Sequence, residues 1–141
     1  MNGEETYQLP LTGPRSAHEE LVNSITHGAG FFVSIVASIA LVAAAIERGT
    51  VWTVLGCGIY SVTLMLVYLA STLSHLYQRP KAKRAWRILD QAFIYLLVAG
   101  SYTPWALEYL REGWPLLVLI LMWGVALGGF VSKLFFAHRV D

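Results

Sequence analysis

Three residues in the middle of the chain carry side chains suited to metal and acid–base chemistry. Ser71 and His75 are four residues apart, so on a helix they share one face. Asp90 follows a basic stretch and opens the next apolar run, at the same end as His75. A histidine can bind zinc through one ring nitrogen, and a nearby carboxylate can orient a metal-bound water. The sequence therefore predicts a shared site in which Asp90 and Ser71 are catalytic candidates and His75 is the metal-ligand candidate.

A second polar set precedes the first apolar run. Glu20, Asn23 and His27 fall at positions i, i+3 and i+7, which places them on one face of a helix. Ser16 and Glu19 form the S-x-x-E pattern of a capping box, so this helix is expected to begin at about Ser16. We expect Glu20, Asn23 and His27 to form a supporting polar layer beside the shared site.

Simpler explanations exist for each of these residues taken alone. A polar side chain at the end of a membrane helix reaches water at little cost, and a serine such as Ser71 can bond back to its own helical turn. Catalytic zinc normally takes three protein ligands, and the chain offers too few. His18 precedes the apolar segments and His138 follows the last one, so neither is expected to be a ligand. The sequence predicts only a partial zinc site.

The composition is that of a membrane protein. Hydrophobic residues make up 56% of the chain and charged residues 13%, with a mean hydropathy of +0.55, far more apolar than a soluble domain. The net charge of +1 argues against nucleic-acid binding, which usually requires a basic stripe. Cys57 is the only cysteine and lies in an apolar run, so it is expected to be a small buried hydrophobe.

Four apolar runs predict an all-α, polytopic transmembrane helix bundle. Each run is long enough to cross a hydrocarbon core of about 30 Å at 1.5 Å per residue. The expected spans are 29–46, 51–76, 88–107 and 114–136, within a membrane domain at 17–141. Residues 1–16 lack the features of a signal peptide and are expected to be a flexible cytoplasmic tail.

Two features of the later spans bear on packing. Gly100 and Pro104 lie near the far end of the third span, where a kink is tolerated if neighbouring helices satisfy the freed backbone groups. Gly124 and Gly128 form a small-xxx-small pair in the fourth span, which lets another helix approach closely. Self-association through these glycines is therefore an expectation.

Basic residues predict the orientation of the chain in the plasma membrane. Cytoplasmic loops are enriched in lysine and arginine. Only Arg48 and Arg111 belong to the end opposite the basic stretch. The other basic residues, on the expected cytoplasmic side, are Arg15, Arg79, Lys81, Lys83, Arg84, Arg87, Lys133 and Arg139. The amino terminus and the expected loop at 78–87 are therefore predicted to be cytoplasmic.

The polar pattern resembles the hemolysin III family, the bacterial branch of the progestin and adipoQ receptors. The resemblance covers residues 20–104, and the fourth span fits the same plan. It combines E-x-x-N-x-x-T-H, S-x-x-x-H and an aspartate at the start of the third span. The residues that carry it are Glu20, Asn23, Thr26, His27, Ser71, His75 and Asp90.

The resemblance implies a fold and a zinc site. Family members have seven spans and carry zinc near the cytoplasmic face, so His75 would be a direct ligand, Asp90 would hold the zinc-bound water, and Ser71 would support the site. The remaining family ligands are two histidines in a late H-x-x-x-H on the seventh span, a motif that this sequence lacks. With four of the expected seven spans, the chain looks like the front part of a longer protein or a shortened product.

The resemblance also implies two functions of different classes, each involving membrane lipids. One is a zinc-dependent membrane hydrolase acting on lipid amides, with a catalytic site that these residues alone leave incomplete. The other is a protein without catalysis, either pore-forming and cytolytic or active in membrane lipid homeostasis. The sequence does not identify a lipid substrate.

Overall fold

The computed structural model describes residues 17–136, which form four helices and no strand. The helices are α1 (Ala17–Arg48), α2 (Val51–Leu76), α3 (Pro80–Tyr109) and α4 (Trp114–Phe136). The predicted all-α membrane helix bundle is confirmed. The expected amino-terminal tail, the capping residue Ser16 and His138 lie outside the described residues.

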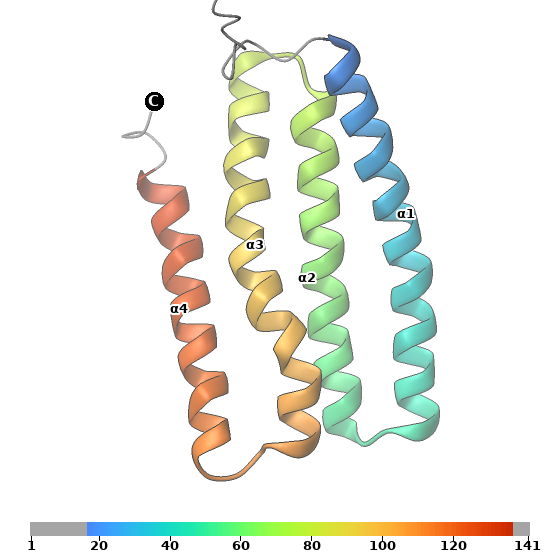
Figure 1. Cartoon of the computed structure of the whole chain (residues 1–141), viewed down its shortest axis with the longest axis vertical. Helices are drawn as coiled ribbons and strands as arrows, with labels where there is room; N and C mark the ends of the chain where they lie inside the picture. Colours follow the sequence, from blue (N-terminus) through green and yellow to red (C-terminus); the bar gives the residue numbers. More distant parts are fainter. Residues whose placement is uncertain (1–16, 137–141) are drawn as a thin grey trace, which may run out of the picture.

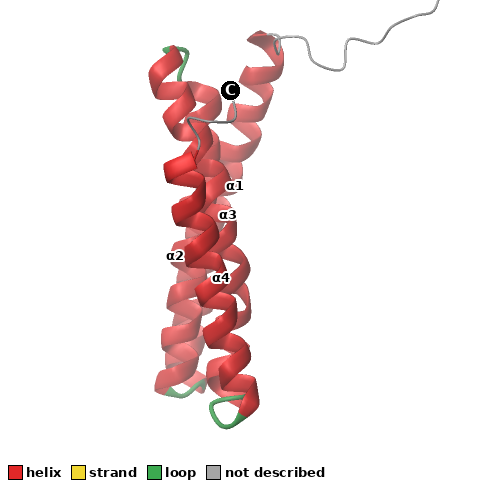
Figure 2. Cartoon of the chain, turned by 90° about the vertical axis from the view of Figure 1, so that its left-hand side faces the viewer, coloured by secondary structure: helices red, strands yellow, loops and turns green. Residues whose placement is uncertain are grey.

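The four helices run antiparallel and stand side by side in chain order. Figure 1 shows them as a row from α1 to α4, and Figure 2 shows the same row almost edge-on. The main contacts join consecutive helices, α1 with α2, α2 with α3, and α3 with α4. Consequently the last turn of α2 and the first turns of α1 and α3 lie at the same end of the bundle, at the top of Figure 1.

Three of the four helices are long and apolar enough to cross a membrane, namely α1, α2 and α4. The third helix, α3, is not among them. However, α3 lies alongside both α2 and α4 and connects the end of one to the start of the other. A membrane crossed by α2 and α4 is therefore also crossed by α3.

The basic segment at 78–87, predicted as a loop, is mostly helical, and this prediction was wrong. Helix α3 begins at Pro80, a residue well suited to the first helical position, after a short connection that begins at Tyr77. The alanine, lysine and arginine residues that follow are good helix formers. The basic side chains are therefore fixed on the faces of a helix instead of lying in a loop.

Small residues allow α3 to pack closely against both of its neighbours. A side chain at Gly56 of α2 would collide with the backbone of Pro104, and one at Gly129 of α4 would meet the Tyr95 ring. The Trp123 indole also donates a hydrogen bond of 3.0 Å to the Thr103 hydroxyl, which ties α4 to α3. Figure 1 shows α3 bent in its second half, the part that contains Pro104.

Four residues noted in the sequence differ in their exposure. Cys57 is buried and has no disulfide partner among the described residues, as predicted. His18 is exposed in the first turn of α1. Gly124 and Gly128 are exposed, and a side chain added at either would meet no atom within 4 Å. This face of α4 is therefore open to another helix.

Candidate functional site

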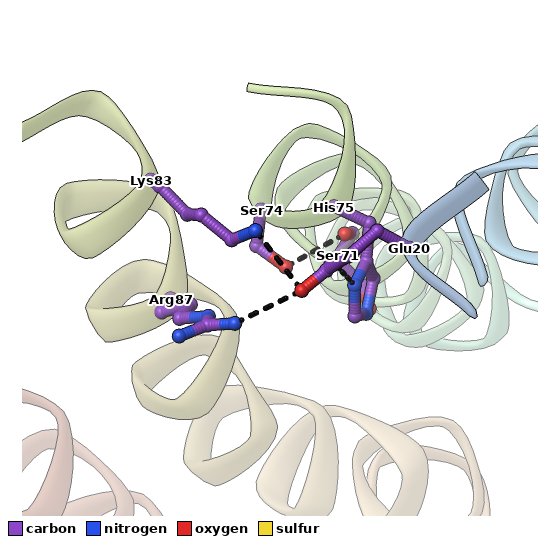
Figure 3. A network of polar contacts seen from close by, with 6 residues as sticks. All are labelled: Glu20, Ser71, Ser74, His75, Lys83 and Arg87. Carbon is purple, nitrogen blue, oxygen red and sulfur yellow. Dashed lines mark hydrogen bonds and ion pairs between the residues drawn. The ribbon is translucent and has the colours of Figure 1, made fainter. Parts of the chain in front are cut away.

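One buried carboxylate connects three helices, at the end of the bundle where α3 has its first turn. Glu20, in the first turn of α1, is only 4% exposed. Its Oε2 lies 2.7 Å from Nδ1 of His75 on α2. Its Oε1 lies 2.9 Å from Nζ of Lys83 and 3.2 Å from Nη2 of Arg87, both on α3. Figure 3 shows these three partners converging on the Glu20 carboxylate.

The charge on Glu20 is stabilised by its partners. Burial by itself would raise the pKa of the Glu20 carboxyl, but hydrogen bonds from His75 and Lys83 outweigh it and lower this pKa to about 2. Glu20 lies in the first turn of α1, well before the apolar run that begins at residue 29. The carboxylate is therefore ionised at neutral pH and acts as a fixed acceptor for the groups around it.

The contact with Glu20 determines which ring nitrogen of His75 is available. The His75 side chain is buried, and a carboxylate at Nδ1 favours the tautomer in which Nδ1 carries the proton. The lone pair then belongs to Nε2. The His27 ring stacks on the His75 ring with 5.6 Å between centroids and 23° between planes. Two histidines from neighbouring helices thus lie together beside one carboxylate.

A cavity of about 940 Å³ collects most of the predicted site residues. Asp90 lines it and is half-buried, and its carboxyl group interacts with Ser71, His27 and His75. The predicted residues that line the cavity are Glu20, His27, Ser71, His75 and Asp90. Three helices thus deliver polar groups to one space. The roles assigned to these groups stay predictions.

Asn23, predicted to belong to the same polar layer, does not line this cavity. The helical repeat explains the difference. At about 100° per residue, His27 lies within about 20° of Glu20 around the α1 axis, whereas Asn23 is rotated by about 60°. Asn23 is half-buried, and its role in the supporting polar layer stays a prediction.

Sequence reasoning missed the two cations that hold Glu20. Lys83 and Arg87 are four residues apart, and Asp90 and Gln91 follow within the next turn, so they share a face of α3. All four line the cavity. This spacing is informative only if 80–90 is helical, and interpreting the segment as a topological loop concealed it.

Comparison with known proteins identifies the family. A sequence model of the family described as "Haemolysin-III related" matches residues 15–140, nearly the whole chain. The chain belongs to this family. It is 46% identical over 123 residues to Hemolysin-3 of Bacillus cereus and 40% identical over 121 residues to a Hemolysin-3 homolog of Bacillus subtilis. No solved structure matches the chain.

The matches cover most of this chain but only part of each relative. Each covers 86% of this chain but only 55% of the Bacillus cereus protein and 57% of the Bacillus subtilis protein. The chain therefore spans little more than half the length of these family members. What the family members do as whole proteins comes to this chain only as a proposal.

The zinc-binding roles predicted for His75 and Asp90 stay predictions. Within residues 17–136, no group of three or more histidine, cysteine, aspartate or glutamate side chains could hold a metal ion. His75 nevertheless has the arrangement of a zinc-binding histidine, because a carboxylate engages its second ring nitrogen. Asp90 lines the same cavity and offers an acceptor for a water molecule. These residues fit one direct ligand and one water-holding group.

Proposed function

We propose that the chain contributes to a zinc-dependent membrane hydrolase site that acts on lipid amides. The observation that carries the proposal is the Glu20 contact to Nδ1 of His75, with Asp90 in the same cavity. A zinc ion supplies Lewis acidity and lowers the pKa of a bound water toward neutrality. Since catalytic zinc takes three protein ligands, two would come from outside the described residues.

Each residue has a distinct task in this proposal. Nε2 of His75 is the ligand atom, and Glu20 is a positioning residue that keeps the imidazole in one tautomer and orientation. Asp90 accepts a hydrogen bond from the attacking water and takes up its proton as the general base. Ser71 interacts with the Asp90 carboxyl and orients it. Lys83 and Arg87 fix the charge of Glu20.

The test measures zinc and amide hydrolysis in protein expressed from the complete natural gene and purified in detergent. His75→Ala should lose both zinc and hydrolysis of a fluorescent N-acyl sphingoid amide. Asp90→Asn should keep most of the zinc and lose about 10²-fold or more in kcat, the usual contribution of a general base. His18→Ala is the matched control, because His18 is exposed in the first turn of α1. Unchanged zinc content and hydrolysis in His75→Ala would contradict the proposal.

The alternative is a protein without catalysis, cytolytic or active in membrane lipid homeostasis. The name Hemolysin-3 of the Bacillus cereus relative favours cytolysis. Dye release from lipid vesicles separates the alternatives. If the protein releases dye, and His75→Ala and Asp90→Asn leave that release and the zinc content unchanged, the cytolytic function replaces the hydrolase. If neither dye release nor hydrolysis occurs, a homeostatic role becomes the better proposal.

We also propose that the chain lies in the plasma membrane with Lys83 at the cytoplasmic face and Arg111 outside. The support is the unequal number of basic residues at the two ends of the bundle along the helix axes. Reporter cysteines at these two positions, introduced with Cys57→Ala, test the orientation. An impermeant reagent added to intact cells should label the cysteine at 111 and leave the one at 83 unlabelled. The reverse pattern would show the opposite orientation.

Self-association is the remaining proposal, supported by the open face at Gly124 and Gly128. Chemical crosslinking of the protein in membranes should give dimers. Gly124→Leu with Gly128→Leu should abolish them, because leucine side chains would keep the two helices apart. Dimers that survive both substitutions would place the interface elsewhere.

A further inference from the structure

A second cavity lies between α3 and α4, next to the polar cluster but on the other side of α3. Its volume is about 870 Å³, within the range of ligand pockets. Four cations line it: Lys83, Arg84 and Arg87 from α3 and Lys133 from the last turn of α4. Among residues 17–136, no carboxylate lines this cavity. Glu20 pairs with Lys83 and Arg87, and Lys133 brings a further cation to the rim from α4.

The same groove becomes apolar toward the middle of the two helices. A third cavity, of about 510 Å³, is lined by apolar side chains and Tyr95, among them Val98, Val125 and Ala126. Tyr95 lines both cavities, and Gly129, one turn from Val125, leaves room for its ring. The rings of Phe93 and Phe130, 5.7 Å apart, join the same two helices. One groove therefore runs from a basic rim to an apolar interior.

The dimensions of the groove match one leaflet. From Lys133 back to Val118, the α4 wall extends for about 22 Å at 1.5 Å per residue. Half of a hydrocarbon core is about 15 Å, which leaves several ångströms for a headgroup. Basic pockets between transmembrane helices bind anionic lipid headgroups. A soluble anion would leave the apolar part of the groove without a binding partner, and a neutral lipid would leave the charges of the basic rim without one.

We propose that the groove between α3 and α4 binds one anionic phospholipid, with its phosphate at the rim formed by Arg87 and Lys133 and an acyl chain along Tyr95, Val98 and Val125. This groove lies on the α4 side of α3 and shares Lys83 and Arg87 with the cavity of the proposed hydrolase site. Lys133 is half-buried, so its alkyl stem covers the groove while its ammonium group reaches the phosphate. Binding does not depend on hydrolysis.

The test uses the whole chain in nanodiscs of equimolar phosphatidylglycerol and phosphatidylcholine, followed by native mass spectrometry. The wild type should retain one phosphatidylglycerol in preference to phosphatidylcholine. Lys133→Gln should weaken this retention about fivefold, the usual effect of one basic residue at a lipid surface. Lys81→Gln is the matched control, because Lys81 lies in the first turn of α3 but does not line the groove. It should change retention by less than about twofold.

A second variant tests the apolar part of the groove. Val125→Trp should reduce retention of both lipids, since the indole would occupy the space of the acyl chain. Helical circular dichroism and a monodisperse elution profile verify that each variant is folded.

Three outcomes would overturn the proposal. Equal losses in Lys133→Gln and Lys81→Gln would indicate a diffuse surface potential instead of a site. Displacement of the phospholipid by millimolar inorganic phosphate would indicate a simple anion site. Absence of any enrichment of phosphatidylglycerol on the wild type would show that another helix or bulk lipid occupies the groove.

Discussion

A carboxylate is held by hydrogen bonds near each end of the bundle, Glu20 of α1 at one end and Glu108 of α3 at the other, yet the two arrangements differ in kind. At one end, Glu20 is buried and bound by a histidine and two cations beside a cavity. At the other end, the hydroxyls of Thr50 and Thr53 donate to Oε2 of Glu108, with Thr50 at 2.6 Å.

The two carboxylates also differ in what their hydrogen bonds accomplish. Thr50 is the N-cap of α2, and its capping box with Thr53 is completed by Glu108 from α3. These hydrogen bonds lower the pKa of the half-buried Glu108 carboxyl, which lies past the apolar run of α3. The contacts at this end satisfy the start of a helix and require no cavity. Burial and charged partners around an open space, and not a bound carboxylate alone, therefore mark the candidate site.

The largest expected effect is on stability at the buried end. Glu20→Gln removes the acceptor charge from His75, Lys83 and Arg87, and we expect a loss of about 2–3 kcal/mol in the free energy of unfolding. Glu108→Gln is the matched control and should change stability less, because Glu108 is only half-buried and its hydrogen-bond partners are neutral hydroxyls. Denaturant titration in micelles measures both. Equal losses would contradict the distinction between the two ends.

The pH dependence sharpens the same comparison. Because the pKa of Glu20 is lowered from 4.5 to about 2, its ionised form contributes stability above pH 4.5 that is lost as pH falls toward 2. The melting temperature of the wild type should therefore fall toward that of Glu20→Gln across this window. A constant difference between the two proteins down to pH 2 would show that Glu20 is not the titrating group.

A smaller loss is expected at the capped end. Thr50→Ala removes an N-cap side chain, which typically stabilises a helix by about 1 kcal/mol. Thr50→Ser keeps the hydroxyl and should retain most of that stability. Neither change should alter zinc content, because Thr50 lies at the opposite end of α2 from His75. A change in zinc content with Thr50→Ala would mean that the two ends are coupled.

The smallest effect concerns the outer partner of Glu20. The Arg87 side chain is 46% exposed and that of Lys83 only 19%. Arg87→Gln should therefore cost only about 0.5 kcal/mol, as for a solvated ion pair, and Lys83→Gln should cost more. Denaturant titration of the two variants gives the order. A larger loss for Arg87→Gln would identify Arg87 as the principal partner.

The helices whose bounds could be predicted are those formed by uninterrupted apolar runs of sequence. Helices α2 and α4 have the bounds expected for the second and fourth spans because polar residues flank both runs sharply. Hydropathy reports the length of apolar sequence and not of helix. It therefore missed that α3 starts at Pro80, whereas the early start of α1 was predicted from the S-x-x-E capping pattern and not from hydropathy.

The candidate site could be predicted only in part for a related reason. Ser71, His75 and Asp90 stand at one end of adjacent helices, so chain order and apolar length were enough to bring them together. The central position of Glu20 and the contributions of Lys83 and Arg87 depend on which face of α3 turns toward α1 and α2. That rotation is set by helix packing, including the close approach at Gly56, and the hydropathy pattern does not report it.

The central claim is that Glu20 holds Nδ1 of His75 and leaves Nε2 as the ligand atom. Nitrogen NMR of histidine-labelled protein in micelles, at about pH 8 and during zinc titration, tests this claim most directly. We predict that His75 has its proton on Nδ1, that zinc shifts the Nε2 resonance, and that Glu20→Gln mixes the tautomers and weakens the zinc response. A proton on Nε2 in the wild type, or a zinc shift at Nδ1, would contradict the account.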